Sequence, residues 1–196
     1  MCAVDVRPAI GTERLILRGV TRADAPAIAE LANDLGVAGN TAVLPYPYRM
    51  ADAEAFVACA ERADPRKAAA FAIEHRQFGL VGMLGFQEKA PGIGSPMPNP
   101  EQQSRSQSER GRAEAGYWLG RPFWNRGYAT EALTAALRWA KGDWRRNVVW
   151  AGHFADNRAS GQVLVKAGFL YTGDVESRMS QARAEPVPTR MMVWLA

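Results

Sequence analysis

The sequence contains no run of about 18 apolar residues, the length that a membrane-spanning helix requires. Its first residues include Asp5 and Arg7, where a secretory signal would be apolar. Cysteine is nearly absent, and Cys2 and Cys59 form neither a disulfide framework nor a metal-type pair. We therefore expect a cytoplasmic protein with two free thiols and no membrane partner.

The chain also lacks a block of lysine and arginine. Its 24 basic and 20 acidic residues are scattered and give a formal net charge of +4. This mild excess is compatible with an anionic ligand, but a nucleic-acid-binding domain would require a clustered basic patch. The sequence therefore predicts no nucleic-acid partner.

The composition that is present is that of an ordinary globular chain, with 47% hydrophobic and 22% charged residues. A length of 196 residues fits one domain, so residues 1–196 are predicted to form a single unit. Residues 89–112 are rich in Pro, Gly, Ser and Gln, with almost no large apolar side chain. They predict a flexible, solvated insertion at about 90–112, with a lid over the substrate as the alternative.

Hydrophobic periodicity predicts an α/β chain in which strands and helices are interspersed. Strand-like segments are residues 12–18, 69–75, 80–87, 113–120, 148–154, 169–175 and 187–195. Helical periodicity is found in residues 21–36, 53–60, 127–141 and 157–167. Thr21 and Asp24 have the spacing of a capping box, and Gly168 stands where a helix-ending glycine is expected.

One turn is suited to binding phosphate. In residues 124–130 (WNRGYAT), a turn containing Gly127 leads into a helix that starts with small residues. Main-chain N–H groups at such a helix start point outward at the positive end of the helix dipole. Gly127 allows close approach, Ala129 keeps the first turn narrow and Arg126 adds a positive charge. The alternative is an ordinary tight turn of an α/β protein.

The segment GYWLGRPFWNRGYATEAL, with Trp124-Asn125-Arg126-Gly127-Tyr128-Ala129, resembles the acetyl-CoA loop Q/R-x-x-G-x-G/A of the GNAT superfamily of N-acetyltransferases. Trp124 departs from the Q/R position, as is typical of the branch with the ribosomal-protein N-terminal (alanine/serine) acetyltransferases. Residues 157–169 (NRASGQVLVKAGF) resemble the family segment N-x-x-S-x-x-V-L-x-K-x-G-F, and TERLILR resembles its first strand.

The resemblance implies a mixed, mostly antiparallel, splayed sheet of six to seven strands flanked by about four helices. It also implies acetyl-CoA as cosubstrate, no metal, and direct transfer of the acetyl group to a primary amine of a peptide N-terminus or a small molecule. The alternative is a non-catalytic acyl-CoA-binding or sensing domain on the same fold. The oligomeric state is not specified, and a homodimer remains an option.

The resemblance further implies which residues bind the cofactor. Main-chain N–H groups of residues 117–119 would hold the pantetheine and the thioester oxygen, and those of residues 125–130 the pyrophosphate. The expected cofactor-binding set is Tyr117, Trp118, Leu119, Trp124, Asn125, Arg126, Gly127, Tyr128, Ala129, Thr130, Asn157, Ser160 and Lys166. Many relatives have a tyrosine seven residues after the asparagine to serve the leaving sulfur. Leu164 occupies that position here. Related N-terminal acetyltransferases have a serine three residues after the asparagine, and Ser160 stands there, so the resemblance assigns the contact with the leaving sulfur to Ser160.

The general base is less well defined. An attacking amine must lose a proton, because a lysine amine titrates near ~10.4 and an α-amine near ~8. Glu114 is one candidate, since alternation places it on one strand face with Trp118. His153 is the second and Glu176 the third. The alternative for Glu114 is a solvent-facing strand carboxylate, and the alternative for His153 is a structural histidine.

Overall fold

The computed structural model describes residues 9–88 and 113–196, so Cys2 and the insertion expected at about 90–112 lie outside the described residues. The strands are β1 (Ile10–Gly11), β2 (Leu15–Gly19), β3 (Ala68–His75), β4 (Gly79–Glu88), β5 (Ala113–Leu119), β6 (Val148–Phe154), β7 (Leu170–Ser180) and β8 (Glu185–Leu195). The helices are α1 (Ala25–Ala32), α2 (Leu35–Ala38), α3 (Met50–Arg62), α5 (Tyr128–Gly142) and α6 (Arg158–Lys166), with 3-10 turns η1 (Arg22–Asp24) and η2 (Arg121–Phe123).

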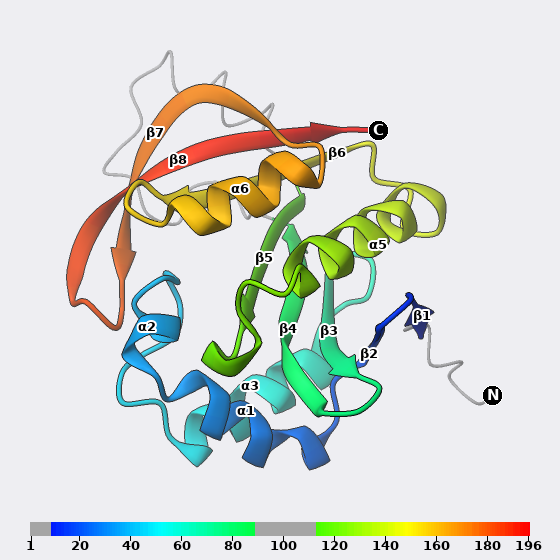
Figure 1. Ribbon diagram of the computed structural model, residues 1–196, viewed down its shortest axis with the longest axis vertical. Coiled ribbons are helices and arrows are strands. Elements are labelled where there is room, and N and C mark those ends of the chain that lie inside the picture. The colour runs from blue at the N-terminus through cyan, green and yellow to red at the C-terminus, as the bar shows by residue number, and fades with distance from the viewer. Residues whose placement is uncertain (1–8, 89–112) are drawn as a thin grey trace.

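The strands form one sheet in the order β1-β2-β3-β4-β5-β6-β8-β7, and only the pair β5–β6 is parallel (Figure 1). The predicted mixed, mostly antiparallel sheet is therefore confirmed. It has one or two strands more than predicted, and one of its eight strands is the two-residue β1. Within the described ranges there are five α-helices rather than four.

The extra helix arises because the prediction of one helix over residues 21–36 was wrong. Asn33 ends α1, and its side-chain oxygen accepts a hydrogen bond from the Tyr48 N–H at 3.0 Å. Asp34 is extended and caps the separate helix α2, accepting from the Val37 N–H at 3.1 Å. Short polar side chains that bind the backbone in this way compete with helix continuation.

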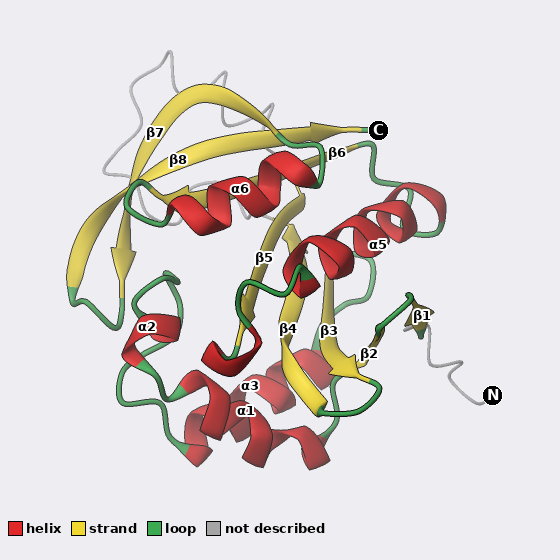
Figure 2. Ribbon diagram, viewed as in Figure 1, coloured by secondary structure: helices red, strands yellow, loops and turns green. Residues whose placement is uncertain are grey.

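Helices cover both faces of the sheet because the strand residues alternate between two cores. On β3, Phe71 and Ile73 belong to the core that includes α5 and Leu164 of α6, whereas Ala72 belongs to the core with α1 and α3. This alternation is the period of two of a strand buried on both faces. Figure 2 shows α5 and α6 side by side on the viewer's face of the sheet.

The one parallel pair leaves an opening in the middle of the sheet. β5 pairs with β6 only over Ala113–Ala115 and Val149–Ala151. Beyond these residues the two strands separate, with α5 and α6 on either side of the gap (Figure 1). Among the strands of residues 9–88 and 113–196, the second half of β5 therefore pairs with β4 alone. None of the described helices is long and apolar enough to cross a membrane.

Candidate functional site

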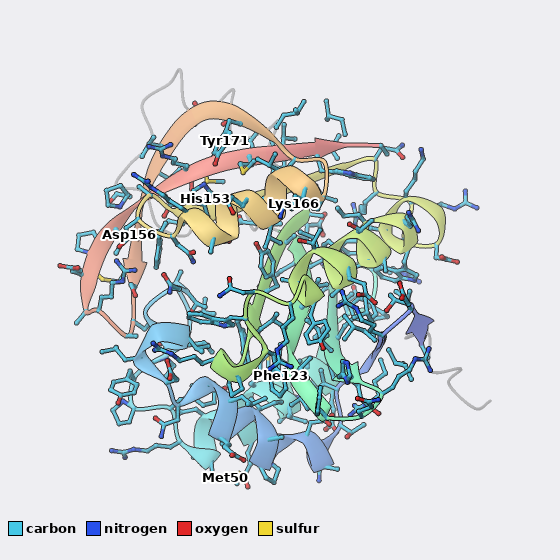
Figure 3. All side chains as sticks on the ribbon, in the orientation of Figure 1. Met50, Phe123, His153, Asp156, Lys166 and Tyr171 are labelled. Carbon is cyan, nitrogen blue, oxygen red and sulfur yellow. The ribbon has the colours of Figure 1, made fainter. Side chains whose placement is uncertain are left out.

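A cavity of about 580 Å³ opens where β5 and β6 separate. Its walls are the end of β5, the turn into α5, the first turns of α6 and the segment around α2. Most of the residues expected to bind a cofactor line it: Tyr117, Trp118, Leu119, Trp124, Asn125, Gly127, Tyr128, Ala129, Thr130, Asn157, Ser160 and Lys166. Figure 3 shows Phe123, another lining residue, on the connection after β5, and Lys166 at the end of α6.

The turn into α5 presents unpaired main-chain amides to this cavity. Gly127 has φ 80° and Asn125 φ 59°, so the chain passes twice through the left-handed region before the helix. The first helical hydrogen bond runs from the Glu131 N–H to the Gly127 carbonyl at 3.0 Å. The N–H groups of residues 128–130 therefore have no partner within the helix. Such a turn at a helix N-terminus is a concave site for an anion.

Arg14 holds this turn from the side of β2. Its Nη1 donates to the Arg126 carbonyl at 3.0 Å, and its Nε donates to Glu131 Oε2 at 2.8 Å. Glu131 Oε1 also accepts from the Thr12 hydroxyl at 2.6 Å. Burial opposes ionisation of Glu131, but the hydrogen bonds from Thr12 and Arg14 outweigh it and hold the pKa of Glu131 below its ordinary value. The resulting carboxylate is favourable in the first turn of α5.

Arg14 was not among the predicted site residues, although it belongs to the TERLILR segment. Arg126 was predicted to bind the cofactor, but its side chain is exposed and does not line the cavity. Its contribution is the main-chain carbonyl that accepts from Arg14. That the Arg126 side chain adds a charge for a bound phosphate stays a prediction.

Two hydroxyl groups face each other across the opening, one from β5 and one from α6. The Tyr117 hydroxyl lies 2.9 Å from Ser160 Oγ and 3.1 Å from the Ser160 carbonyl oxygen. Burial raises the pKa of Tyr117 to about 12, despite the hydrogen bond to Ser160. Asn157 caps α6 by accepting from the Ser160 N–H at 3.1 Å, which holds Ser160 in the first turn.

Leu164, at the position where many relatives carry a tyrosine, is completely buried in the core beneath α5 and does not line the cavity. Two hydroxyl-bearing residues that do line the cavity are Tyr117 on β5 and Ser160 at the start of α6, one turn before Leu164.

Glu114 does not reach the cavity, contrary to expectation. Its carboxylate forms an ion pair with Arg178, whose Nη2 also binds Glu176 at 2.9 Å. Trp118, on the same strand face, does line the cavity, because it lies beyond the point where β5 leaves β6. Two of the three candidate bases are therefore bound to one guanidinium outside the cavity.

His153 also lies outside the cavity lining. Its Nδ1 is 2.8 Å from the Phe154 carbonyl, which can only accept, so Nδ1 carries the proton. Its Nε2 then accepts from the Tyr171 hydroxyl at 3.0 Å. The ring is buried and packs so closely under α6 that a Cβ atom on Gly161 would lie 2.9 Å from Nε2 (Figure 3 labels His153 and Tyr171). This is the structural histidine of the alternative reading.

The structure adds cavity residues that the sequence patterns did not indicate. Asn40 and Thr41 follow α2, and Asp156 precedes α6. Among the described lining residues, Asp156 is the sole carboxylate. Hydrogen bonds from Arg183, the shorter at 2.6 Å, hold the pKa of Asp156 below its ordinary value. Arg183 also donates to the Gly39 carbonyl at 2.6 Å and so ties the β7–β8 turn to the α2 segment.

The described part of the cavity therefore combines a row of amides at a helix start, the edge of β5 beyond its pairing with β6, a hydroxyl pair and one carboxylate. Within residues 9–88 and 113–196, no group of three or more His, Cys, Asp or Glu side chains is placed to hold a metal ion. The donor set fits a ligand with a phosphate-bearing arm that runs along β5.

A family model described as an acetyltransferase (GNAT) domain matches residues 14–170. The curated protein YoaA of Bacillus subtilis (strain 168), named an uncharacterized N-acetyltransferase, is 28% identical over 181 residues. The match covers 89% of this chain and 89% of YoaA.

Solved structures share the architecture. An acetyltransferase (GNAT family) from Bacillus anthracis superposes with a TM-score of 0.73 at 21% identity, over 96% of this chain and 98% of that one. RimL, a ribosomal L7/L12 alpha-N-protein acetyltransferase solved with coenzyme A, gives a TM-score of 0.71 at 18% identity, over 96% and 98%. At such identities these likenesses show the shared fold.

Proposed function

The chain belongs to the GNAT family of acetyltransferases, and we propose that it transfers an acetyl group from acetyl-coenzyme A directly to a primary amine. The observation that carries this proposal is the row of unpaired amides at the start of α5, beside the strand edge where β5 leaves β6. A helix N-terminus favours the diphosphate of acetyl-coenzyme A, and the strand edge offers main-chain groups to its thioester arm.

In the proposed complex, the amides of residues 128–130 bind the pyrophosphate, and Arg158 and Lys166 add positive charge from α6. The main-chain edge of residues 117–119, beyond the pairing of β5 with β6, binds the pantetheine arm and the thioester carbonyl. Donors aimed at that carbonyl stabilise the oxyanion that develops when the amine attacks. Asn157 lies on the opposite wall, and its side-chain amide is available to the pantetheine arm.

We propose that Ser160 serves the leaving sulfur. Ser160 lines the cavity, and the Asn157 cap holds its main chain in the first turn of α6. A thiol titrates near ~8.5, so the departing thiolate needs a hydrogen bond rather than a strong acid. A serine hydroxyl supplies that bond without changing its own charge.

The acceptor amine would enter at the end of the cavity lined by Asn40, Thr41 and Asp156. The carboxylate of Asp156, kept ionised by Arg183, attracts and orients the ammonium form of the acceptor. With a lowered pKa it is a weak base, so we propose that the amine proton leaves through water. The proposed acceptor is a peptide N-terminus or a small-molecule amine.

The role of Asp156 is tested with Asp156→Asn. We expect kcat/KM for the amine to fall about 10- to 150-fold, as for a lost hydrogen bond to a charged group, while the KM for acetyl-CoA stays unchanged. Asp174→Asn, on the exposed part of β7, is the matched control. An Asp156→Asn enzyme with unchanged amine kinetics would remove Asp156 from acceptor binding.

The activity itself is tested by mixing the purified protein and acetyl-CoA with a panel of amines: N-terminal peptides, polyamines and amino acids. Thiol release and mass spectrometry of the acceptor report the reaction. Steady release with an acetylated amine supports the proposal. Thermal stabilisation by acetyl-CoA without turnover on any amine would contradict transfer, and no stabilisation would contradict the donor site.

A further inference from the structure

The hydroxyl pair of Tyr117 and Ser160 has more acceptors than protons. The Tyr117 hydroxyl has one proton and two acceptors within reach, the Ser160 carbonyl at 3.1 Å and Ser160 Oγ at 2.9 Å. The Ser160 hydroxyl likewise has one proton, which can point to Tyr117 Oη or into the cavity. Because the two protons cannot both lie between the two oxygens, there are two arrangements in which the hydroxyl groups are hydrogen-bonded to each other.

In the first arrangement, Tyr117 donates to the Ser160 carbonyl and Ser160 donates back to Tyr117. The serine proton is then used within the pair, and only its lone pairs face the cavity. In the second arrangement, Tyr117 donates to Ser160 Oγ, and the serine proton is free to point into the cavity. The carbonyl of Ser160 retains an acceptor role in the i→i−4 pattern of α6.

We propose that Tyr117 is a positioning residue that donates its hydroxyl proton to Ser160 Oγ and thereby directs the Ser160 proton to the sulfur of the leaving thiolate. This inference rests on the proposed function, because the sulfur is that of the acyl donor. It assigns to the Tyr117 side chain a role separate from that of its main-chain N–H.

Tyr117 is suited to this role in two respects. Since its pKa is raised to about 12, the phenol keeps its proton throughout the pH range in which the enzyme would be assayed. Its ring packs against the main hydrophobic core, and its strand, β5, is paired with β4. The hydroxyl therefore has a fixed position. A hydroxyl that accepts a hydrogen bond becomes a better donor, because the bonds in a chain polarise one another.

The step balances without a change in the charge of either side chain. The amine nitrogen forms the C–N bond, and the C–S bond then breaks with its electron pair passing to sulfur. The Ser160 proton bonds to that sulfur without leaving Oγ, and the Tyr117 proton stays on Oη. The amine loses its proton to water, and the released thiolate takes a proton from water according to its pKa.

A purely structural role, in which Tyr117 only ties α6 to β5, makes a different prediction. If Tyr117 is only structural, Tyr117→Phe should lower kcat further in a chain that already carries Ser160→Ala. If Tyr117 acts through the Ser160 hydroxyl, Tyr117→Phe should have no further effect on kcat in that chain. A double-mutant cycle separates the two cases.

The experiment compares steady-state kinetics of the wild type with Tyr117→Phe, Ser160→Ala and the double variant, using acetyl-CoA and the best amine of the panel. We expect Tyr117→Phe to lower kcat about 2- to 12-fold, as for a lost hydrogen bond between neutral groups. The KM for acetyl-CoA should stay within about twofold, and the double variant should be no slower than Ser160→Ala. Tyr48→Phe, a second buried tyrosine whose pKa burial also raises to about 12, is the control and should keep the wild-type rate.

Two results would overturn the inference: a Tyr117→Phe enzyme as fast as the wild type, or a double variant whose loss is the product of the two single losses. A wild type that releases no thiol would instead contradict the proposed function. If Tyr117→Phe does not fold, 3-fluorotyrosine at position 117 replaces it in the comparison. That more acidic phenol is a stronger donor, so the rate should equal or exceed that of the wild type, and a slower enzyme would contradict the inference.

Discussion

The guanidinium of Arg14 donates a hydrogen bond to the carbonyl oxygen of Arg126 at 3.0 Å, joining the start of β2 to the turn before α5. The same guanidinium binds Glu131, one turn into the helix. The turn that presents its amides to the cavity is therefore held by a residue 112 positions earlier in the chain.

Replacement of Arg14 by alanine is expected to raise the KM for acetyl-CoA about 3- to 10-fold with a smaller change in kcat. The turn would lose two hydrogen bonds, one of them to a charged carboxylate, and the amides would no longer be held in place. Arg22→Ala, at a highly exposed site on η1, is the control and should leave both constants unchanged. An unchanged KM in Arg14→Ala would show that the turn keeps its shape without this contact.

Gly127→Val is expected to raise the dissociation constant for acetyl-CoA at least tenfold. A β-branched residue is strained at a φ of 80°, so the turn would rearrange and its amides would no longer converge. Isothermal titration calorimetry measures the effect. Gly142→Ala, at the other end of α5 where a Cβ atom meets nothing within 4 Å, serves as control. Wild-type affinity in Gly127→Val would remove residues 128–130 from phosphate binding.

Glu114→Gln is expected to leave the rise of rate with pH unchanged, because the carboxylate is bound to Arg178 outside the cavity. The variant should instead lose about 1–3 kcal/mol of unfolding free energy, since the partly buried Arg178 loses a charged partner. Denaturant unfolding and a pH–rate profile measure the two effects. Glu185→Gln, exposed on β8, is the control for stability. A flattened alkaline limb in Glu114→Gln would restore Glu114 as the base.

Asp24→Asn is expected to reduce stability in a pH-dependent way. Burial opposes ionisation of Asp24, but hydrogen bonds from Arg18, at 2.7 and 2.8 Å, and from Thr21 lower its pKa. A lowered folded-state pKa stabilises the protein above the unfolded value of about 3.9, and this stabilisation is lost as the pH falls through the folded value. The wild type should therefore exceed the variant by about 1.5–3 kcal/mol at pH 7.

This difference should narrow below about pH 3.9 in urea unfolding series. Asp174→Asn, at an exposed carboxylate on β7, should show no such dependence. If the difference in unfolding free energy between the wild type and Asp24→Asn stays constant at all acidic pH values, the ion pair with Arg18 does not cause it.

Much of the architecture follows from local patterns along the chain. The buried face of α5 repeats every three or four residues, as in Leu133, Ala136, Leu137 and Ala140, and the hairpin of β3 and β4 alternates around a turn at Gly79. The amide-bearing turn at Gly127 was also recognisable, because a glycine at a helix start with small residues is a local feature. The break between α1 and α2 was missed, since the Asn33 contact with Tyr48 joins residues 15 positions apart.

The catalytic assignments depended on long-range contacts instead. Glu114 meets Arg178 at a separation of 64 positions, and Tyr117 meets Ser160 at 43. Strand alternation correctly placed Glu114 and Trp118 on one face of β5. Glu114 lies where β5 still pairs with β6 and is outside the cavity, whereas Trp118 lies beyond that pairing and lines the cavity.

Periodicity and turn chemistry thus predicted most of the helices and strands and the turn at Gly127, and the motif resemblance indicated the family, because these features depend on residues within a few positions of one another. The partner of each polar side chain, and so its availability for chemistry, was settled by sheet order and helix packing. Those contacts bring together residues whose spacing in the chain carries no information about their distance in space.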